Sequence, residues 1–319
     1  MRVAIIGGTG YVGSYIVDKL IANGHQPHVL VRRGHEDKLR QAELCEQVKG
    51  DLSDRSALEQ LIKPADAVIF NVGILRAFPS KGITFEDLQY KGAVDCIDIA
   101  VQYGVKRFIL MSANGVEAES TPYQLTKRNA EHYLWQSGLN GTVFRPSVIF
   151  GDPRGLDEFA TSLMRDLIKA PLPAPLFYSG LIPKSPGGFE LSPVHIEDVA
   201  TAMVKSLEMP ETSGRTIALG GPESISWLGI LKILGQVAGK KKLMLPAPVF
   251  GVYALATLFD RFAMFPITRD QLKMLLQGNT CSDAFFKEID VAPTAFSTDS
   301  LGYLLTDSKE QAFCQKHAS

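Results

Sequence analysis

The chain has 319 residues, enough for one large α/β domain or for a domain with a smaller lobe. Its 33 Lys and Arg residues nearly balance its 34 Asp and Glu residues, and the formal net charge of −1 argues against DNA or RNA binding, which relies on a strongly basic surface. A composition of 45% hydrophobic and 21% charged residues predicts an ordinary buried core.

Short apolar runs alternate with helical patterns through the first half of the chain. The expected strands are RVAII (2–6), HVLV (28–31), a short strand ending at Val48, DAVIFNV (66–72), RFILMS (107–112) and GTVFRPSVIF (141–150). These runs are almost uncharged, as are strands buried on both faces of a parallel sheet. Apolar residues at helical spacing predict a first helix from Val12 to Ile21, which Asn23 and Gly24 end. The alternation predicts an α/β fold with a Rossmann-type doubly wound parallel sheet, and a dinucleotide-binding core over residues 1–151.

The pattern changes after residue 151. We expect residues 152–319 to form mainly a smaller C-terminal α/β lobe, with some segments returning to the core. Residues 170–188 are dense in Pro and Gly and are expected to form a loop. Helices are expected near 197–207, 226–237 and 269–276, and a strand at 215–219. The lobe should cover the carboxyl ends of the strands, where open α/β sheets bind ligands.

The expected lack of a signal peptide and the spacing of the cysteines favour a cytoplasmic protein. No signal peptide is expected, because Gly7 and Gly8 interrupt the apolar residues after Met1. The four cysteines are Cys45, Cys96, Cys281 and Cys314. Their wide spacing argues against a zinc site or a disulfide framework, and we expect no other metal site.

The longest uncharged run, Leu243 to Phe259, has 17 residues. A membrane-spanning helix needs about 20 apolar residues, so we interpret this run as a buried or dimer-forming helix. The alternative is a peripheral contact with a membrane through residues 240–265, because Lys240, Lys241 and Lys242 precede the run.

The sequence IIGGTGYVG places Gly7, Gly10 and Gly13 in a G-x-x-G-x-x-G array between the first strand and the first helix. Gly7 tolerates the positive φ of a tight turn. Gly10 lets the backbone approach a pyrophosphate, to which the helix N-terminus offers N–H donors. In this context the array predicts a dinucleotide site, and a purely structural glycine-rich turn is the alternative.

The residues after the second strand indicate which nucleotide is bound. NAD-binding domains usually place an acidic residue there to hold the ribose 2′-hydroxyl, whereas this chain has Val31, Arg32 and Arg33. A guanidinium can pair with the 2′-phosphate of NADP. We therefore expect NADP(H) rather than NAD(H), with Arg32 as the main contact, or else a solvated surface arginine. Asp51 could accept a hydrogen bond from the adenine amino group.

These features together resemble the short-chain dehydrogenase/reductase superfamily. The motifs that carry the resemblance are the glycine array, GDLSD (50–54), FNVG (70–73), Tyr123-x-x-x-Lys127 and FRPSVIFGD (144–152). SPVHIEDVA (192–200) and ALGGPESIS (218–226) are typical of the extended or atypical, epimerase/dehydratase-like branch. VGIL (72–75), FRPSVIFGD and PITRDQLKMLLQGN (266–279) resemble proteins related to the nucleotide-binding accessory subunit of respiratory complex I.

Tyr123 and Lys127 are four residues apart, on one face of a helix. A free tyrosine titrates near 10, and both the lysine ammonium and an oxidised nicotinamide would favour its phenolate. The resemblance implies that the tyrosine exchanges a proton, the lysine holds the nicotinamide ribose and a serine steadies the substrate oxygen. Ser112 is the candidate serine. Ala113 occupies the superfamily's usual position, however, so Ser112 can equally just end a strand, and Asn114 could donate instead.

The predicted catalytic residues are Tyr123, Lys127 and Ser112. The predicted cofactor contacts are Gly7, Thr9, Gly10, Tyr11, Val12, Gly13, Arg32, Arg33, Asp51, Leu52, Val72, Gly73, Lys127, Pro146 and Val148. One interpretation is an NADP-dependent oxidoreductase or epimerase acting on a small carbonyl or alcohol. The other is a non-catalytic accessory, assembly or sensor module, for which the resemblance implies contact with a respiratory complex through residues 240–265. The sequence does not identify the particular substrate, because the residues that line the substrate site would come from the second half of the chain and from residues 74–84.

Overall fold

The structure is a computed structural model that describes residues 1–251 and 268–305, and it divides into two compact units. Unit 1 comprises Met1–Pro146, Ile196–Leu219 and Ala284–Val291. Unit 2 comprises Ser147–His195, Gly220–Asp283 and Ala292–Ser319. Each unit has its own buried apolar cluster, and each is described separately below.

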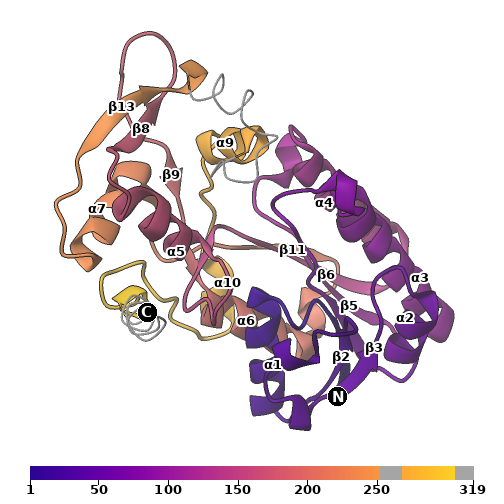
Figure 1. Ribbon diagram of the computed structural model, residues 1–319. Coiled ribbons are helices and arrows are strands. Elements are labelled where there is room, and N and C mark those ends of the chain that lie inside the picture. The colour runs from indigo at the N-terminus through magenta and orange to yellow at the C-terminus, as the bar shows by residue number, and fades with distance from the viewer. Residues whose placement is uncertain (252–267, 306–319) are drawn as a thin grey trace. The chain divides into compact units, whose positions relative to one another are not determined.

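Unit 1 is built on a parallel sheet of seven strands (Figure 1). The strands are β1 (Arg2–Ile6), β2 (Gln26–Val31), β3 (Glu46–Lys49), β4 (Ala67–Phe70), β5 (Arg107–Met111), β6 (Asn140–Pro146) and β11 (Arg215–Leu219). Their order is β11-β6-β5-β4-β1-β2-β3, and every neighbouring pair is parallel. This arrangement confirms the predicted Rossmann-type doubly wound sheet.

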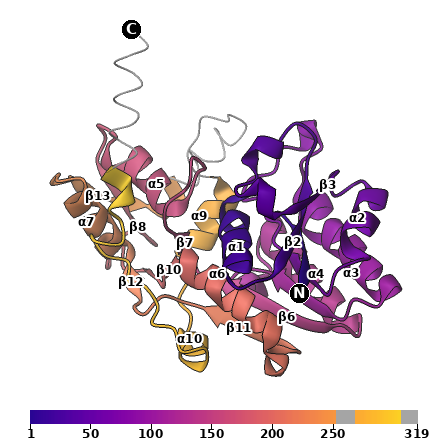
Figure 2. The same cartoon turned by 90° about the horizontal axis from the view of Figure 1, so that it is seen from below.

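Helices cover both faces of this sheet. They are α1 (Tyr11–Ala22), α2 (Arg55–Ile62), α3 (Gly92–Tyr103), α4 (Pro122–Gln136), α6 (Ile196–Lys205) and the short α10 (Ala284–Glu288). Figure 2 shows α1 and α6 together on one face and α2, α3 and α4 on the other. The β4 and β5 runs are fully buried, and α2, α3 and α4 contribute apolar residues to one cluster with the strands. Burial on both faces explains why the strands read as continuous apolar runs rather than alternating ones.

The order of the strands reverses between β1 and β4. The chain builds β1, β2 and β3 outward in one direction, then starts again at β4 and builds β5 and β6 in the other. Ligands of open α/β sheets bind in the crevice beyond the carboxyl ends of the strands at such a reversal. The segments that follow β1 and β4 therefore define where a dinucleotide site is expected in unit 1.

The described residues of unit 2 form three short two-stranded sheets and several helices. The elements are β7 (Ile149–Phe150) with β10 (Val194–His195), β9 (Glu190–Leu191) with β12 (Ile225–Ser226), β8 (Ala174–Tyr178) with β13 (Met244–Pro248), and helices α5 (Phe159–Leu163), α7 (Trp227–Val237) and α9 (Arg269–Leu276). Trp227 is buried at the centre, against Phe177 and Phe189, and donates its Nε1–H to the Pro175 carbonyl (2.9 Å). This cluster replaces the large sheet as the core of unit 2.

Three segments differ from the sequence expectation. Residues 170–188 are not all loop, because Ala174–Tyr178 forms β8. The run 141–150 is two strands, β6 and β7. The expected helix from Leu243 is wrong for Met244–Pro248, which is β13, and proline in a helix interior removes a hydrogen bond and clashes with the preceding turn. The part of that expected helix from 252 to 259 lies outside the described residues.

Candidate functional site

The glycine array forms the connection between β1 and α1. Gly7 has a φ of +92°, and a Cβ there would lie 2.5 Å from the Asn71 carbonyl oxygen, beyond the end of β4. A Cβ on Gly13 would lie 2.0 Å from the Gly7 carbonyl oxygen. Both positions therefore require glycine, one for its backbone conformation and one for the close approach of helix and loop.

The N-terminus of α1 is open to an anion. Gly10 is the N-cap residue and supplies no side chain to the helix N–H groups, and the first turn carries no acidic residue. Thr9, Tyr11 and Val12 are partly exposed beside it. A 12-residue helix whose N-cap has no capping side chain presents the positive end of its dipole, which favours a phosphate.

Arg32 and Arg33 follow β2 directly and are exposed. Neither guanidinium forms an ion pair with another residue of the described chain. The Gly50 N–H donates to the Val31 carbonyl (3.0 Å), which holds the start of the 50–54 segment against the end of β2. The hydroxyl and N–H of Ser53 lower the pKa of the Asp51 carboxyl, and the positive charge of Arg32 contributes to this. The two predicted adenosine-binding residues, Arg32 and Asp51, thus act on each other electrostatically.

Lys127 lies at the ends of two neighbouring strands. Its Nζ donates to the carbonyl oxygens of Val72 (2.8 Å) and Met111 (2.7 Å), which follow β4 and end β5. A Cβ on Gly73 would lie 3.4 Å from this Nζ, so a backbone without a side chain runs alongside the ammonium. An ammonium has three N–H donors, and the two carbonyls leave one for a ligand. Burial lowers the pKa of Lys127 to about 8, against the opposing charge of Glu131.

Tyr123 lies one helical turn before Lys127 on α4, whose N-cap Thr121 accepts a hydrogen bond from the Gln124 N–H (3.3 Å). Its ring meets the ring of Phe85 edge-to-face, with centroids 6.0 Å apart. Burial raises the pKa of the Tyr123 phenol to about 12. Without a bound cofactor this phenol is protonated at neutral pH.

Ser112 follows β5 and is buried, and its Oγ forms no hydrogen bond with another described residue. Its backbone N–H donates to the Phe144 carbonyl (2.8 Å). The hydroxyl lies close enough to the Glu131 carboxylate to lower its pKa. Ser112 therefore faces a buried charged group on α4, and it does not stand on an exposed surface.

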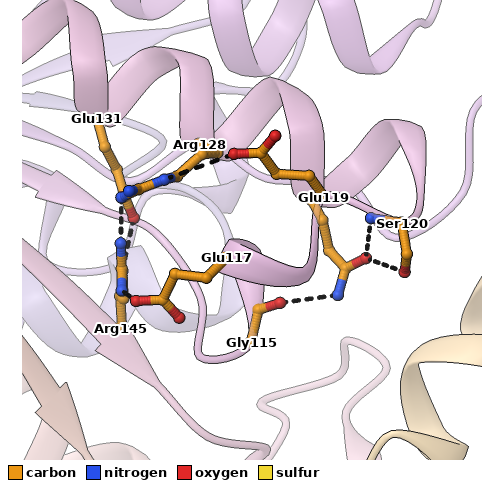
Figure 3. A network of polar contacts seen from close by, with 8 residues as sticks. Gly115, Glu117, Glu119, Ser120, Arg128, Glu131 and Arg145 are labelled. Carbon is orange, nitrogen blue, oxygen red and sulfur yellow. Dashed lines mark hydrogen bonds and ion pairs between the residues drawn. The ribbon is translucent and has the colours of Figure 1, made fainter.

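That group is Glu131, which belongs to a network of ion pairs and hydrogen bonds around α4 (Figure 3). Glu131 accepts hydrogen bonds from Arg145 at 2.8 and 2.5 Å and from Arg128 at 2.9 Å. Arg145 also pairs with Glu117, and Arg128 lies 3.8 Å from Glu119. Burial opposes ionisation of Glu131, but its partners outweigh this and lower its pKa. The network connects α4 and β6 to the loop that precedes Tyr123.

The sequence reasoning missed Glu131, Arg145 and Gln89. Gln89 donates to the Ile74 carbonyl (2.9 Å) and accepts from the Thr126 hydroxyl (3.0 Å), so it connects the loop after β4 to α4. Glu131 continues the spacing of four from Lys127, and Arg145 is a charge within a buried strand. Both signals were visible in the sequence.

The remaining predicted contacts are distributed over both units. Leu52 packs beside Gly92 and the core cluster of unit 1. The Pro146 carbonyl accepts a hydrogen bond from the Asn114 N–H (2.9 Å), also in unit 1. Val148 belongs to unit 2, where its carbonyl accepts from the Val194 N–H (3.0 Å). Within unit 1 the structure brings Val72, Gly73, Lys127 and Tyr123 together, beside the end of β5.

Comparisons with known proteins agree with this geometry. Residues 7–164 match the family model described as NAD(P)H-binding. The chain is 27% identical over 302 residues to the photosystem II assembly factor Ycf39 of Trieres chinensis, covering 94% of this chain and 89% of that protein. It is 24% identical over 261 residues to a ceramide reductase of Caulobacter vibrioides, covering 82% and 78%. It is 27% identical over 301 residues to the mitochondrial NADH dehydrogenase 1 alpha subcomplex subunit 9 of Dictyostelium discoideum, covering 91% and 80%.

Among solved structures, the UDP-glucose 4-epimerase of Thermus thermophilus in complex with NAD has the same fold. The TM-score is 0.70 at 20% sequence identity, covering 96% of this chain and 98% of that one. These findings confirm the resemblance to the short-chain dehydrogenase/reductase superfamily and to the complex I accessory subunit. They also confirm a nicotinamide-nucleotide-binding domain. Among the described residues, no helix is long and apolar enough to cross a membrane.

Proposed function

Starting from an NAD(P)H-binding domain over residues 7–164, we propose that the chain binds NADP(H) and uses Tyr123 and Lys127 as the proton-transfer pair of an oxidoreductase or epimerase. The substrate class is a small carbonyl or alcohol. The observation that carries the proposal is the placement of the Lys127 ammonium. Two backbone carbonyls hold it at the carboxyl ends of β4 and β5, one helical turn from Tyr123 and with one N–H donor left for a ribose hydroxyl.

The residues present fit the dinucleotide. The N-terminus of α1 and the side-chain-free backbone at Gly10 suit the pyrophosphate. The exposed guanidinium of Arg32, next to Asp51, suits a 2′-phosphate better than a 2′-hydroxyl, because it offers two parallel donors to phosphate oxygens. This is why we favour NADP(H) over NAD(H).

The state of Tyr123 favours the reductive direction. NADPH, when bound, supplies the hydride, and the protonated Tyr123 phenol can donate its proton to the carbonyl oxygen. Acting as a base at neutral pH would require the pKa to fall from about 12 to about 7, which corresponds to roughly 7 kcal/mol. Lys127 and an oxidised nicotinamide must supply that stabilisation of the phenolate. At pH 7 the free protein therefore holds Tyr123 in the protonation state that reduction requires.

Residues 74–84 are the part of unit 1 best placed to select a substrate. Phe78 and Ile83 pair in a tight antiparallel bridge, and Gln89 holds the loop at Ile74. The loop leads to Phe85, which touches the Tyr123 ring. A substrate that approaches the phenol would meet this segment.

The test is a titration of the purified protein with NADPH, followed by fluorescence or calorimetry. Lys127→Met should lose about 10- to 100-fold in affinity, the scale of a hydrogen bond from a charged group. Lys106→Met is the matched control, because Lys106 is exposed just before β5, at its amino end. Equal affinities of the two variants would overturn the assignment of Lys127.

Turnover is tested separately. NADPH oxidation is followed with a panel of aldehydes and ketones, in the wild type and in Tyr123→Phe. Loss of turnover with nearly unchanged NADPH affinity supports the catalytic assignment, because the phenol contributes at most one neutral hydrogen bond to the cofactor. Turnover that persists in Tyr123→Phe would exclude this phenol as the proton donor.

A second candidate function is a nucleotide-binding accessory or assembly module without turnover. It is favoured by the burial of Ser112 beside Glu131, which leaves the catalytic serine's position without an exposed hydroxyl. Two of the relatives are named as an assembly factor and as a respiratory-complex subunit, which agrees with such a role and with contact through residues 240–265. Residues 252–265 of that segment lie outside the described chain. NADPH binding that raises the melting temperature, without oxidation by any carbonyl tested, would favour this module.

A further inference from the structure

In unit 2, the strands β8 and β13 form a parallel two-stranded ribbon that exposes large apolar side chains. Leu181 is 89% exposed, Ile182 68% and Phe250 62%. Tyr178 pairs with Pro248 at the carboxyl end of the ribbon, so the loop that carries Leu181 and Ile182 and the residues up to Phe250 leave from the same end (Figure 1). The exposed large apolar side chains on the ribbon and at its two ends are Leu172, Leu181, Ile182, Leu243, Leu245 and Phe250. Isolated exposed apolar residues are ordinary, but a concentration on one element marks an interaction surface.

The charge of the same segments is entirely positive. Residues 167–189 and 224–259 contain no Asp or Glu, although the whole chain has a net charge of −1. They contain six lysines, Lys169, Lys184, Lys232, Lys240, Lys241 and Lys242. Lys184 lies two residues after Ile182, and Lys240 and Lys241 are exposed just before β13. Apolar side chains flanked by lysines, without acidic residues, complement an anionic surface that also offers an apolar interior.

The backbone of the ribbon argues against a protein strand as its partner. Both β8 and β13 are edge strands, because their sheet has two strands. Pro175, Pro246 and Pro248 lack the N–H donor that an added strand would need. The exposed apolar atoms therefore need a partner that does not rely on backbone hydrogen bonds, and a lipid surface is such a partner.

We propose that the β8–β13 ribbon is a membrane-contact surface that binds an anionic phospholipid bilayer, with Leu181, Ile182 and Phe250 entering the interface and the lysines contacting headgroup phosphates. The ribbon then lies on the surface of the bilayer. This surface lies wholly in unit 2 and is independent of the Tyr–Lys pair of unit 1.

The test is co-sedimentation of the full-length protein with vesicles of phosphatidylcholine alone and of phosphatidylcholine mixed with phosphatidylglycerol. We expect binding to the anionic vesicles that weakens at high salt, because surface charges are screened. The double variant Leu181→Asp/Ile182→Asp should lose at least about 100-fold in partitioning, since it removes two apolar side chains that would enter the bilayer and adds negative charge next to anionic headgroups. The control is Leu44→Asp/Val101→Asp, two exposed apolar residues of unit 1, which should bind as the wild type does.

A second variant tests how much the lysines of the ribbon contribute to binding of anionic vesicles. Lys184→Ser/Lys240→Ser/Lys241→Ser should lose up to about 100-fold on anionic vesicles, at about five-fold for each lysine near the surface. The control removes the same charge from three exposed lysines of unit 1, Lys38, Lys63 and Lys106. Equal losses for both triple variants would mean that only net charge matters, and would overturn the assignment of the ribbon.

Two further results would also overturn the proposal. One is the absence of binding to anionic vesicles at low salt. The other is a dimer, seen by analytical ultracentrifugation, that Leu181→Asp/Ile182→Asp dissociates while vesicle binding is absent, because the ribbon would then bind a second copy of the chain. NADPH affinity, measured in parallel, should be unchanged in every ribbon variant, which separates this proposal from that of the cofactor site.

Discussion

Replacing Glu131 with Gln should lower the free energy of unfolding by about 3–5 kcal/mol, the usual cost of removing one partner from a buried ion pair. The Glu131 side chain is 0% exposed, and its carboxylate accepts three hydrogen bonds, two from Arg145 and one from Arg128. Glutamine keeps the shape of the side chain but leaves the buried Arg145 guanidinium without its buried counterion. The substitution therefore tests the charge and not the packing.

Glu117→Gln is the matched control. Glu117 pairs with the same Arg145 guanidinium, but its side chain is 59% exposed, so its loss should cost only about 0–1 kcal/mol. Urea unfolding followed by circular dichroism gives both values under the same conditions. Equal losses in the two variants, or a loss below about 1 kcal/mol for Glu131→Gln, would refute the reasoning.

The wild type and Glu131→Gln should also differ in how their stability depends on pH. The folded-state pKa of Glu131 is lowered below its ordinary value of 4.5, so its ionised form contributes stability above about pH 4.5 that is lost as the pH falls through the folded pKa. The stability difference between wild type and Glu131→Gln should therefore be largest near neutral pH and shrink on acidification below pH 4.5. A difference that grows on acidification would contradict the sign of the shift.

Further outcomes are expected from substitutions at the cofactor site and from removal of metal ions or disulfides. Arg32→Ala should weaken NADP binding by ~1–3 kcal/mol and leave NAD binding nearly unchanged, which calorimetry with both cofactors checks; equal losses would contradict a 2′-phosphate contact. Gly13→Ala should strongly lower the melting temperature, because its Cβ would lie 2.0 Å from the Gly7 carbonyl oxygen; Gly10→Ala, at 3.4 Å from that oxygen, should fold normally and lose NADPH affinity. A chelator or a reductant should leave the melting temperature unchanged, and a fall of many degrees with either would reveal a metal or a disulfide.

Local requirements made much of unit 1 predictable from the sequence. Gly7 needs a positive φ and Gly13 a close backbone approach, and both needs restrict the residue type itself. Buried parallel strands need apolar side chains on both faces, so β1, β4 and β5 appear as almost uncharged runs. The Tyr–Lys spacing follows from the helical repeat alone.

Contacts between distant segments could not be predicted in this way. The prolines of β8 favoured a loop, and its strand conformation depends on pairing with β13, which lies far along the chain. Ser112 is a hydroxyl at the end of a strand in the sequence, and only the packing of α4 places it beside a buried carboxylate. Glu131 and Arg145 are visible as charges, but their burial and their pairing depend on how α4 lies on β6. The sequence determines which groups can occupy a helix turn or a strand, whereas the tertiary structure decides which of them meet and which are removed from water, because desolvation and ion pairing depend on neighbours that are distant along the chain.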